Sequence, residues 1–427
     1  MNKYDVIIVG GGTAGVSCAW NCGKLGLKTL IIEKNSFLGG SITSSLVIPA
    51  MKTSENAINT DFFEELYKKL YSLGGAITYC DGNKGWFNPE LTKIALDMLM
   101  QEAKVDILFE SYIKDIITKE DKVLSAYIDS IDDYNIEGKK QKILSEPIET
   151  MYLVDSTGDA KICEKLNCKF LENSEEISQP SSLRFIMAGV NIKEFTDWLL
   201  AYDTDRDVST GCLVDDYTLV STAYTWDSNK EWALTPLFKQ AIANNELSEA
   251  DCNYFQLFSV AGTSDSIAFN APRLLNNISS RSKLYQEGRL SIYKLSKFCK
   301  KYLPGFGNAH ISSIANTLGV RLSRLVVGKY IYTYDDIITS KKFENPVVIS
   351  NYPVDIHSNK QNTSVLEKVN QEYQLPLESL MVKGFDNLFV IGRCLSAEPK
   401  AQAALRIIPS CFSMGEGLAK YLATIKN

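Results

Sequence analysis

The sequence predicts an α/β protein whose main domain, built on a parallel sheet, is interrupted by an inserted α+β domain. Three observations favour this class. A β-branched apolar run leads into a glycine-rich turn and a helix of small residues, over residues 4–25. A second apolar run leads into Thr157-Gly158-Asp159, and a third, at 388–391, leads into Gly392-Arg393. A strand so late in the chain can join the first sheet only if the intervening residues form a separate domain.

The composition is that of a globular protein with a small-molecule partner. The chain has 427 residues, of which 45% are hydrophobic and 22% charged, which suits about two domains with their own cores. Its 45 basic and 51 acidic residues give a net charge of −6, so we expect neither nucleic acid nor an anionic membrane as a partner. No apolar run approaches the roughly 18 to 20 residues of a membrane helix.

The ten cysteines are scattered along the chain and include no C-x-x-C pair. This spacing predicts neither a zinc site nor a redox dithiol, and no other metal site is expected. No charged and then apolar leader precedes the first strand, so export is not expected. We therefore expect a protein of the reducing cytoplasm.

The first strand, turn and helix carry a Rossmann-like fingerprint. Gly10, Gly12 and Gly15 form G-x-G-x-x-G directly after the apolar run 4–9. The first glycine permits a tight turn, the second lets the backbone approach a pyrophosphate, and the third lets helix and strand pack closely. A second strand, 28–32, ends at Glu33, near the distance at which an acid binds an adenosine ribose. These features together predict a dinucleotide site.

The other elements of the main domain follow from periodicity and turn signals. They are a helix over 61–73, a strand at 106–109, three strands of an antiparallel meander at 113–117, 123–128 and 148–154, and a C-terminal helix over 409–422. The charged run DDYNIEGKKQK, residues 132–142, is interpreted as a solvated hairpin.

A glycine pair after the ribose-binding acid bears on which dinucleotide binds. Gly39 and Gly40 close the segment KNSFLGG and are followed by Ser41, so the chain can double back over a long cofactor. With the fingerprint and Glu33, this pair resembles the N-terminal signature of the FAD-binding superfamily that includes glutathione reductase and the flavoprotein subunits of succinate dehydrogenase and fumarate reductase. The resemblance implies FAD as the cofactor and a glutathione-reductase-like FAD-binding domain.

The resemblance also implies which residues contact FAD. In that superfamily a second strand-and-glycine element returns to the cofactor, which places Gly158 and Asp159 near its ribityl-pyrophosphate portion. From the residues alone, Asp159 could equally cap a helix. The implied contacts are Gly10, Gly12, Thr13, Ala14, Gly15, Glu33, Lys34, Gly39, Gly40, Ser41, Ile113, Gly158, Asp159, Gly392, Arg393 and Arg406.

Five segments in register resemble the bacterial FAD-dependent oxidoreductases, a branch of the same superfamily. They are FNAPRLL (269–275), LPGFGNAHI (303–311), GVRLSRLVVGKYIYTYDDI (319–337), YPVDIHS (352–358) and the run LPLESLM to AALRI (375–407). The resemblance spans nearly the whole chain. We therefore expect a discontinuous FAD-binding domain at 1–168 and 377–427, with an inserted substrate domain at 169–376.

The inserted domain should supply the catalytic residues, because it must close over the flavin ring. His357 is the first candidate, since a histidine could move a proton while the flavin moves a hydride; holding a loop is an equal alternative. Arg273, Arg321 and Arg324 could bind a carboxylate or stabilise charge on the flavin, or form structural ion pairs. Arg321 and Arg324 are predicted on one side of a helix.

The implied activity is hydride transfer between a small organic substrate, carboxylated ones included, and flavin N5, as in a dehydrogenase or reductase. A flavin-dependent monooxygenase is the main alternative. A tRNA-modifying flavoprotein is disfavoured by the acidic composition, and a non-enzymatic flavin sensor would need no proton-moving residue. The only other G-x-G, at Gly305 and Gly307, is predicted to open a helix with no strand before it. A separate electron donor or acceptor is therefore expected, and the oligomeric state is left open.

Overall fold

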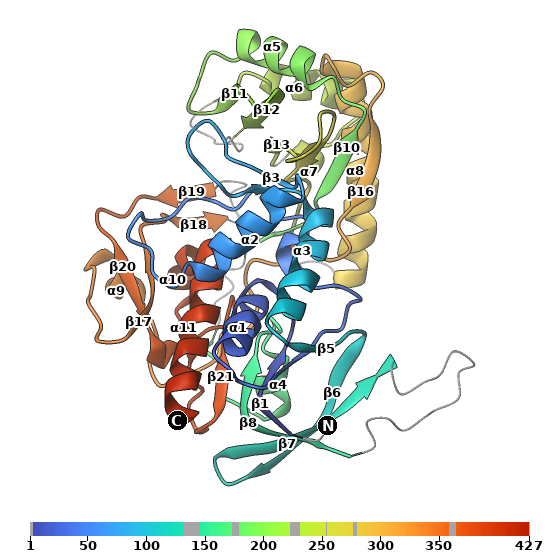
Figure 1. Cartoon of the computed structure of the whole chain (residues 1–427). Helices are drawn as coiled ribbons and strands as arrows, with labels where there is room; N and C mark the ends of the chain where they lie inside the picture. The colour runs from blue at the N-terminus through green and yellow to red at the C-terminus, as the bar shows by residue number, and fades with distance from the viewer. Residues whose placement is uncertain are drawn as a thin grey trace.

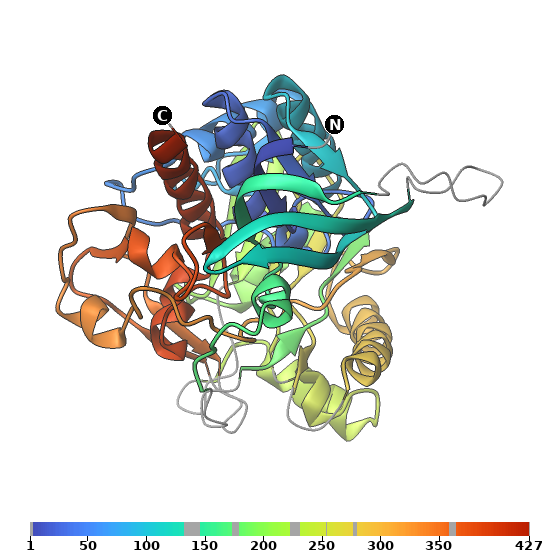
Figure 2. The same cartoon turned by 90° about the horizontal axis from the view of Figure 1, so that it is seen from below.

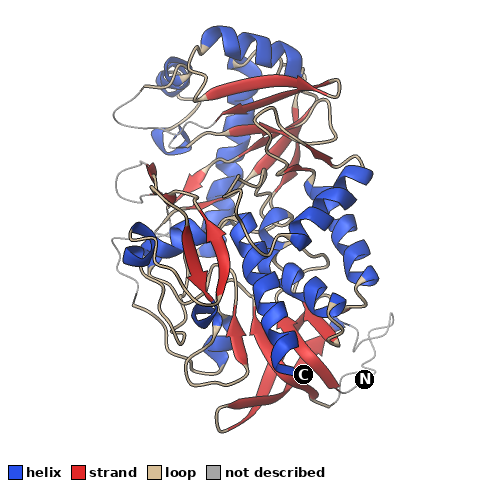
Figure 3. Ribbon diagram, turned by 60° about the vertical axis from the view of Figure 1, so that its left-hand side comes forward, coloured by secondary structure: helices blue, strands red, loops and turns tan. Residues whose placement is uncertain are grey.

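The structure is a computed structural model that describes residues 3–131, 146–172, 179–222, 231–252, 254–275, 280–357 and 364–426. Two sheets lie at opposite ends of the molecule (Figure 1). Both chain termini lie at the end that carries the first sheet. Helices and short strands from widely separated parts of the sequence fill the space between the two sheets (Figure 3).

The first sheet contains the predicted parallel strands. These are β1 (Lys3–Val9), β2 (Thr29–Ile32), β5 (Asp106–Leu108), β8 (Ile148–Asp155) and β21 (Leu388–Val390). Val9 pairs with Ile32 on one side and with Asp155 on the other, and Asp155 pairs in turn with Val390. The carboxyl ends of four strands are therefore level at one edge, and the late strand joins the first sheet as predicted. This arrangement confirms the α/β class.

The predicted antiparallel meander is part of the same sheet. Strands β6 (Ser111–Lys119) and β7 (Lys122–Ser130) pair antiparallel, and β7 pairs with the start of β8. The end of β8 instead lies between β1 and β21, parallel to both. The strand predicted at 148–154 thus joins the meander to the parallel strands (Figure 2). The charged hairpin predicted at 132–142 lies outside the described residues.

One face of this sheet is covered by α1 (Thr13–Lys24) and α11 (Ile408–Lys426), which lie side by side. The Ser17 hydroxyl donates to the Phe412 carbonyl at 2.7 Å. A Cβ on Gly415 would lie 2.3 Å from the Ala14 carbonyl oxygen, so this glycine permits the two helices to approach closely. The helices α2 (Asp61–Ser72) and α3 (Pro89–Glu102) pack beside them.

The second sheet is antiparallel and comes from the middle of the chain. Its order is β11 (Ser209–Val214), β12 (Tyr217–Thr222), β13 (Leu257–Ser259), β14 (Ile267–Phe269), β10 (Phe185–Ala188) and β16 (His310–Ile314). The helices near it are α5 (Ile192–Tyr202), α6 (Thr235–Ala243), α7 (Glu249–Cys252) and α8 (Arg281–Tyr302). The segment with Gly305 and Gly307 follows α8 and leads into a strand, so the prediction that it opens a helix was wrong.

A third group of short elements packs against the C-terminal helices. Strand β17 (Pro346–Ser350) pairs with β20 (Tyr373–Pro376) and lies against α11. Strand β18 (Val354–His357) pairs with β19 (Ser364–Glu367) and lies against α10 (Pro399–Leu405). The shorter elements are η1 (Gly40–Ile42), β3 (Ala76–Ile77), β4 (Trp86–Phe87), α4 (Lys161–Lys165), β9 (Ser181–Ser182), β15 (Arg273–Leu274), α9 (Tyr334–Ile338) and η4 (Leu377–Leu380).

Over the described ranges, no helix combines the length and the apolar character that crossing a membrane would require.

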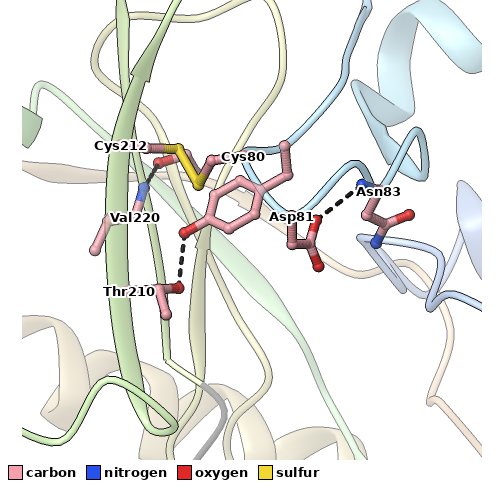
Figure 4. Close-up of a disulfide and its surroundings, with 8 residues drawn as sticks. Cys80, Asp81, Asn83, Thr210, Cys212 and Val220 are labelled. Atoms are coloured by element: carbon pink, nitrogen blue, oxygen red, sulfur yellow. Dashed lines mark hydrogen bonds between the residues drawn. A yellow bond between two sulfur atoms is a disulfide. The ribbon is translucent and has the colours of Figure 1, made fainter.

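A disulfide joins the N-terminal part of the chain to the second sheet. Cys80, which follows β3, is bonded to Cys212 on the edge strand β11 (Figure 4). Beside it the Tyr79 and Thr210 hydroxyls are hydrogen-bonded at 2.7 Å, and Tyr79 stacks on Trp86. Disulfides are typical of oxidising compartments, whereas the cysteine spacing predicts a reducing one.

Candidate active site

The glycine turn after β1 has the geometry that its spacing predicts. Gly10 has a φ of +100°, and a Cβ there would lie 2.5 Å from the Ser156 carbonyl oxygen. A Cβ on Gly15 would lie 2.1 Å from the Gly10 carbonyl oxygen, so helix and turn are in contact. At Gly12, by contrast, the nearest such atom is 4.0 Å away. The space above Gly12 is a cradle that a ligand's pyrophosphate could enter.

The N-terminus of α1 faces this cradle. Its N-cap is Gly12, which has no side chain to bond the first backbone N–H groups, those of Thr13, Ala14 and Gly15. Open N–H groups and the positive end of the helix dipole suit a phosphate. The Thr13 hydroxyl is 2.9 Å from that of Ser41. The polar rim of the cradle is therefore formed by two segments of the chain, the start of α1 and the segment that contains Ser41.

The segment KNSFLGG doubles back over the cradle as expected. Gly39 forms a bridge with Gly12. A Cβ on Gly40 would lie 2.8 Å from the Gly12 Cα, and Gly40 has a φ of +55°. Glycine at position 40 permits the two backbones to approach this closely.

Glu33 ends β2 beside the glycine turn. One carboxylate oxygen accepts the Gly11 N–H at 2.7 Å, and the other accepts the backbone and side-chain N–H groups of Asn35 at 2.9 and 2.7 Å. Burial raises the pKa of Glu33, and these N–H groups partly offset the rise. Lys34 is exposed, whereas Ile113 is buried on β6 in the core that includes Val9 and Ile32.

The opposite rim comes from the ends of β8 and β21. Gly158 and Gly392 both have a positive φ, and a Cβ on Gly392 would be 3.5 Å from the Ala14 Cβ. Asp159 accepts from Arg393 at 2.7 Å and from Arg281 at 2.9 Å. Burial alone would raise the pKa of Asp159, but the two guanidinium groups lower it overall. Asp159 therefore holds two arginines at the rim, and sequence reasoning missed Arg281.

Asp159 does not cap α4. The N-cap residue is Ala160, and the carboxylate of Asp155, at the end of β8, accepts the N–H groups of Ile162 and Cys163 at 2.9 and 3.0 Å. Asp155 is fully buried. The alternative that Asp159 serves as a plain helix cap is thereby removed.

A second polar group lies between the sheets and contains His357 with two predicted arginines. Arg273 donates to His357 Nδ1 at 2.9 Å, and His357 Nε2 is 3.2 Å from an Asp355 carboxylate oxygen. Arg406 contacts the same carboxylate at 3.5 Å. Arg321 donates to the Pro180 carbonyl and to the Ser182 hydroxyl. We call Arg184, Arg273, Arg321, Arg406, Asp355 and His357 the arginine cluster.

The cluster includes residues that sequence reasoning did not find. Arg184 donates to the Ile48 carbonyl at 3.2 Å, in the segment that follows the glycine pair. The Arg273 guanidinium carbon lies over the Tyr254 ring, 4.3 Å from the ring centroid. The Gln179 side-chain oxygen accepts from Arg406 at 3.1 Å. Arg406, expected at the cofactor, lies in this cluster through its contacts with Asp355 and Gln179.

The prediction that Arg321 and Arg324 lie on one side of a helix was wrong. Arg321 and Arg324 do not share a helix, because residues 319–333 are extended and irregular. Arg321 is 8% exposed and points into the cluster, whereas the Arg324 guanidinium pairs with Glu164 of α4 at the surface and packs on Phe170. Residues three apart share a face only in a helix. In this irregular backbone the side chains of Arg321 and Arg324 therefore point in different directions.

The hydrogen bonds fix the protonation state of His357. A guanidinium can only donate, so Nδ1 accepts from Arg273 and the proton lies on Nε2, which donates to Asp355. Burial, reinforced by the positive charge of Arg321, lowers the pKa of His357 to about 3, although Asp355 opposes this. His357 is therefore neutral, and both of its nitrogens are engaged within the protein.

Counted over the described residues, the cluster has more positive than negative side chains. Burial lowers the pKa of Arg321 to about 9 and that of Arg184 to about 10, so both stay charged at neutral pH. Burial alone would raise the pKa of Asp355, but contacts with His357, Arg406 and Arg321 lower it overall. Three guanidinium groups, those of Arg273, Arg321 and Arg406, thus interact with the one described carboxylate, and Arg184 lies near Tyr254 of the same cluster. Unbalanced buried charge is costly, so the cluster is suited to an anion.

A parallel sheet with a glycine cradle, a terminal acid on β2 and a doubled-back glycine pair defines a dinucleotide-binding flavoprotein fold. The sequence profile of the FAD dependent oxidoreductase family matches residues 5–425. The chain belongs to this family and is an FAD-dependent oxidoreductase. The open cradle over Gly12 and the unbonded helix N-terminus fit the pyrophosphate of FAD, and Glu33 is placed to fit its ribose.

The chain is also similar to individual proteins. It is 30% identical over 185 residues to the thiamine thiazole synthase of Methanococcus vannielii, covering 42% of this chain and 66% of the synthase. The chain spans between half and two thirds of the length of the synthases of this kind from two Methanococcus species. Among solved structures, p-nitrophenol 4-monooxygenase from Pseudomonas putida aligns with a TM-score of 0.49 at 11% identity, covering 100% of this chain and 81% of that one.

Proposed function

We propose that the protein transfers a hydride between a small organic carboxylate and flavin N5, as a dehydrogenase or reductase. The observation that carries this proposal is the arginine cluster, in which three guanidinium groups, those of Arg273, Arg321 and Arg406, lie around the single described carboxylate of Asp355. A substrate carboxylate would balance one of the excess charges. It would also be fixed in orientation by a two-pronged contact with a guanidinium.

The residues take distinct parts in this proposal. The glycine cradle and Glu33 hold the adenine end of FAD, and the bound cofactor supplies the hydride-accepting ring. Arg321 and Arg273 bind the substrate carboxylate. Asp355 accepts from His357 and Arg406, which keeps their side chains in place. The inserted domain at 169–376 brings Arg184, Arg273 and Arg321 to one side of the bound substrate.

His357 acts as a positioning residue in this proposal and not as the proton-moving group. The His357 ring accepts a hydrogen bond from Arg273 and donates one to Asp355. Moving a proton through the ring would break one of these two bonds. Tyr352 is the better source of a proton or hydrogen bond for the substrate. Its hydroxyl has no hydrogen-bond partner among the described residues, and it lies in the electrostatic surroundings of Asp355 and Arg406.

The proposal includes a separate electron donor or acceptor, because no second nucleotide fingerprint follows a strand. It also includes a cytoplasmic location, which rests on the spacing of the other cysteines. The state of Cys80 and Cys212 in protein isolated from cells tests that location, because a reducing cytoplasm would keep both thiols free, whereas the structure joins them.

The test is an anaerobic titration of the FAD-loaded protein, followed by its absorption spectrum. Small monocarboxylates and dicarboxylates are compared with the amides of the same acids, which lack the negative charge. We expect the acids to perturb the flavin spectrum, and at least one to reduce the flavin or reoxidise the reduced form. Equal effects of acids and amides would contradict the proposal. Rapid reoxidation by oxygen with hydroxylation of the added compound would favour the monooxygenase alternative.

A further inference from the structure

The helix α4, which follows the cofactor-side Gly158, ends in a motif that brings two cysteines together. Asn167 has a φ of +55°, and its N–H donates to the Glu164 carbonyl at 3.1 Å. The Cys168 N–H donates to the Cys163 carbonyl at 2.9 Å. These two bonds define a Schellman motif, in which the side chains at the third helical position from the end and two residues past the cap meet. Here both of these side chains are thiols.

The two thiols interact and differ in accessibility. Cys163 is fully buried and Cys168 is partly exposed. The hydrogen bond from Cys163 lowers the pKa of the Cys168 thiol, whereas the same bond and burial raise the pKa of Cys163. A partly exposed thiol with a lowered pKa, next to a buried one, is the arrangement of an attacking and a resolving cysteine. The spacing C-x4-C does not by itself indicate a dithiol, because a helix end, and not a short loop, brings Cys163 and Cys168 together.

We propose that Cys163 and Cys168 form a redox-active dithiol that low-molecular-weight disulfides oxidise to an intramolecular disulfide. The Cys168 thiolate attacks one sulfur of the small disulfide, which forms a mixed disulfide and releases one small thiol. The Cys163 sulfur then gives up its proton and attacks the Cys168 sulfur, which releases the second small thiol. Two protein thiols are oxidised and one small disulfide is reduced to two thiols, so atoms and electrons balance.

Other uses of these sulfurs fit less well. Among the described residues, no three His, Cys, Asp or Glu side chains form a group that could hold a metal ion. Cys394 is a third nearby thiol, because it lies in the same buried core as Cys163. Cys394 is fully buried and its sulfur is 3.6 Å from the Ile391 carbonyl oxygen, so no solvent-borne oxidant reaches it first. The pair at the helix end is the accessible one.

The location gives the dithiol a connection to the cofactor domain. Asp155 bonds the N–H of Cys163 directly, and the Thr157 hydroxyl accepts the Lys161 N–H at 2.9 Å. The helix α4 is thus fixed to the strand end that carries Gly158. Both thiols lie within a single turn and loop of that strand end, so the contact between them depends on the fold of this segment.

The test uses the folded, FAD-loaded protein and oxidised glutathione as the probe. Free thiols are alkylated after treatment, and digested peptides are analysed by mass spectrometry. We expect Cys163 and Cys168 to lose alkylation together, with loss of two hydrogen atoms from their common peptides, and to regain it after dithiothreitol. In Cys163→Ser a stable glutathione adduct should accumulate on Cys168, and in Cys168→Ser the remaining Cys163 sulfur should not react.

Cys18 and Cys22 on α1 are the internal control. They lie four residues apart, interact with each other and are fully buried, so they should stay reduced and unlabelled until the protein unfolds. The wild-type labelling pattern decides the matter even if a serine variant fails to fold. Persistent free Cys163, a lasting glutathione adduct on wild-type Cys168, or a disulfide between Cys163 and Cys394 would each overturn the proposal.

Discussion

The glycine cradle and the arginine cluster both suit anions, but they provide positive charge in different ways. At the cradle the charge is partial and comes from the backbone, namely the first N–H groups of α1 and the helix dipole, about half a unit charge in all. The nearby Arg393 and Arg281 are neutralised in part by Asp159. In the cluster, the full charges of Arg273, Arg321 and Arg406 lie around the single described carboxylate of Asp355.

This difference shows which of the two sites needs a ligand to balance its charge. The cradle is nearly balanced without a ligand and can hold FAD without paying for charge burial. Among the described residues the cluster holds more guanidinium groups than carboxylates, so the entry of an anion gains most there. A cofactor that stays bound and a substrate that comes and goes fit these two electrostatic settings. The predictions below probe this contrast, beginning with the largest expected effect.

Within the cradle, Gly10 and Gly12 should separate folding from FAD binding. Gly10→Ala places a Cβ 2.5 Å from the Ser156 carbonyl oxygen at a φ of +100°. We expect a loss of about 3 kcal/mol or more in the free energy of unfolding. Gly12→Ala adds a Cβ to open space, 4.0 Å from its nearest neighbour. It should preserve folding but weaken FAD binding by about 10- to 100-fold, because the methyl group occupies the place of the pyrophosphate.

Thermal unfolding of the FAD-free proteins and fluorescence titration with FAD measure the two effects separately. If Gly12→Ala bound FAD as tightly as the wild type, the cradle would not be the pyrophosphate site. Equal destabilisation by the two substitutions would show that the space above Gly12 is not open.

For the cluster, Arg321 and Arg324 form a matched pair, because one is buried inside it and the other is half exposed outside. Arg321→Gln should raise the KM for a carboxylate substrate by about 30- to 100-fold, in line with the roughly 2 to 3 kcal/mol of a charged hydrogen bond. Arg324→Gln should change KM less than twofold. Steady-state kinetics with the substrate found in the titration measures both. Comparable effects on kcat but not on KM in Arg321→Gln would contradict a binding role.

The cradle could be predicted better than the cluster, because its residues lie closer together in the sequence. Gly10, Gly12, Gly15 and Glu33 are close in the chain, and each has one steric or hydrogen-bonding task that spacing reveals. The cluster is assembled from Arg184, Arg273, Arg321, Asp355 and Arg406, which are brought together only by the tertiary fold. No periodicity connects them, and the irregular backbone around Arg321 made the expected helix wrong.

Other details required backbone geometry that residue types do not specify. Arg281 and Asp159 are 122 residues apart and meet because α8 begins beside the end of β8. Cys163 and Cys168 meet because Asn167 adopts a left-handed conformation. Asparagine is one of the few residues that accepts this conformation readily, so the signal was present in the sequence, but it indicates a helix end and not a redox pair.

The pH dependence of stability should report the neutral state of His357. Its pKa is about 3 in the folded protein and about 6.5 when unfolded, so the unfolded chain binds the extra proton between these values. Stability is therefore greatest above pH 6.5 and falls as the pH decreases, by about 1.4 kcal/mol per pH unit from this group. Denaturant unfolding between pH 6 and 4.5 measures the slope.

His357→Gln provides the control, because an amide can accept from Arg273 and donate to Asp355 without titrating. The variant should lose this part of the slope. The kcat/KM profile should also lack a transition near pH 6 to 7 that depends on His357. A transition of that kind, abolished in the variant, would instead make His357 the proton-moving group.

The smallest expected effects separate two tyrosines near the cluster. The Tyr373 hydroxyl bonds the Ser350 hydroxyl and the carbonyls of Tyr352 and Ala404, at 3.2, 2.9 and 3.2 Å. Tyr373→Phe should lower the free energy of unfolding by about 1 kcal/mol, because buried carbonyls lose their donor. Tyr352→Phe removes a hydroxyl with no partner among the described residues and should change stability by less than about 0.5 kcal/mol.

The reverse order is expected in turnover, since a hydroxyl without a partner in the protein is available to the substrate. Tyr352→Phe should reduce kcat by up to about tenfold, whereas Tyr373→Phe should leave kcat nearly unchanged wherever the protein remains folded. Both variants are compared with the wild type below the midpoint of thermal unfolding. If Tyr352→Phe changed neither stability nor kcat, the anion bound by the cluster would need another hydrogen-bond donor, and the arginines of the cluster would be the candidates.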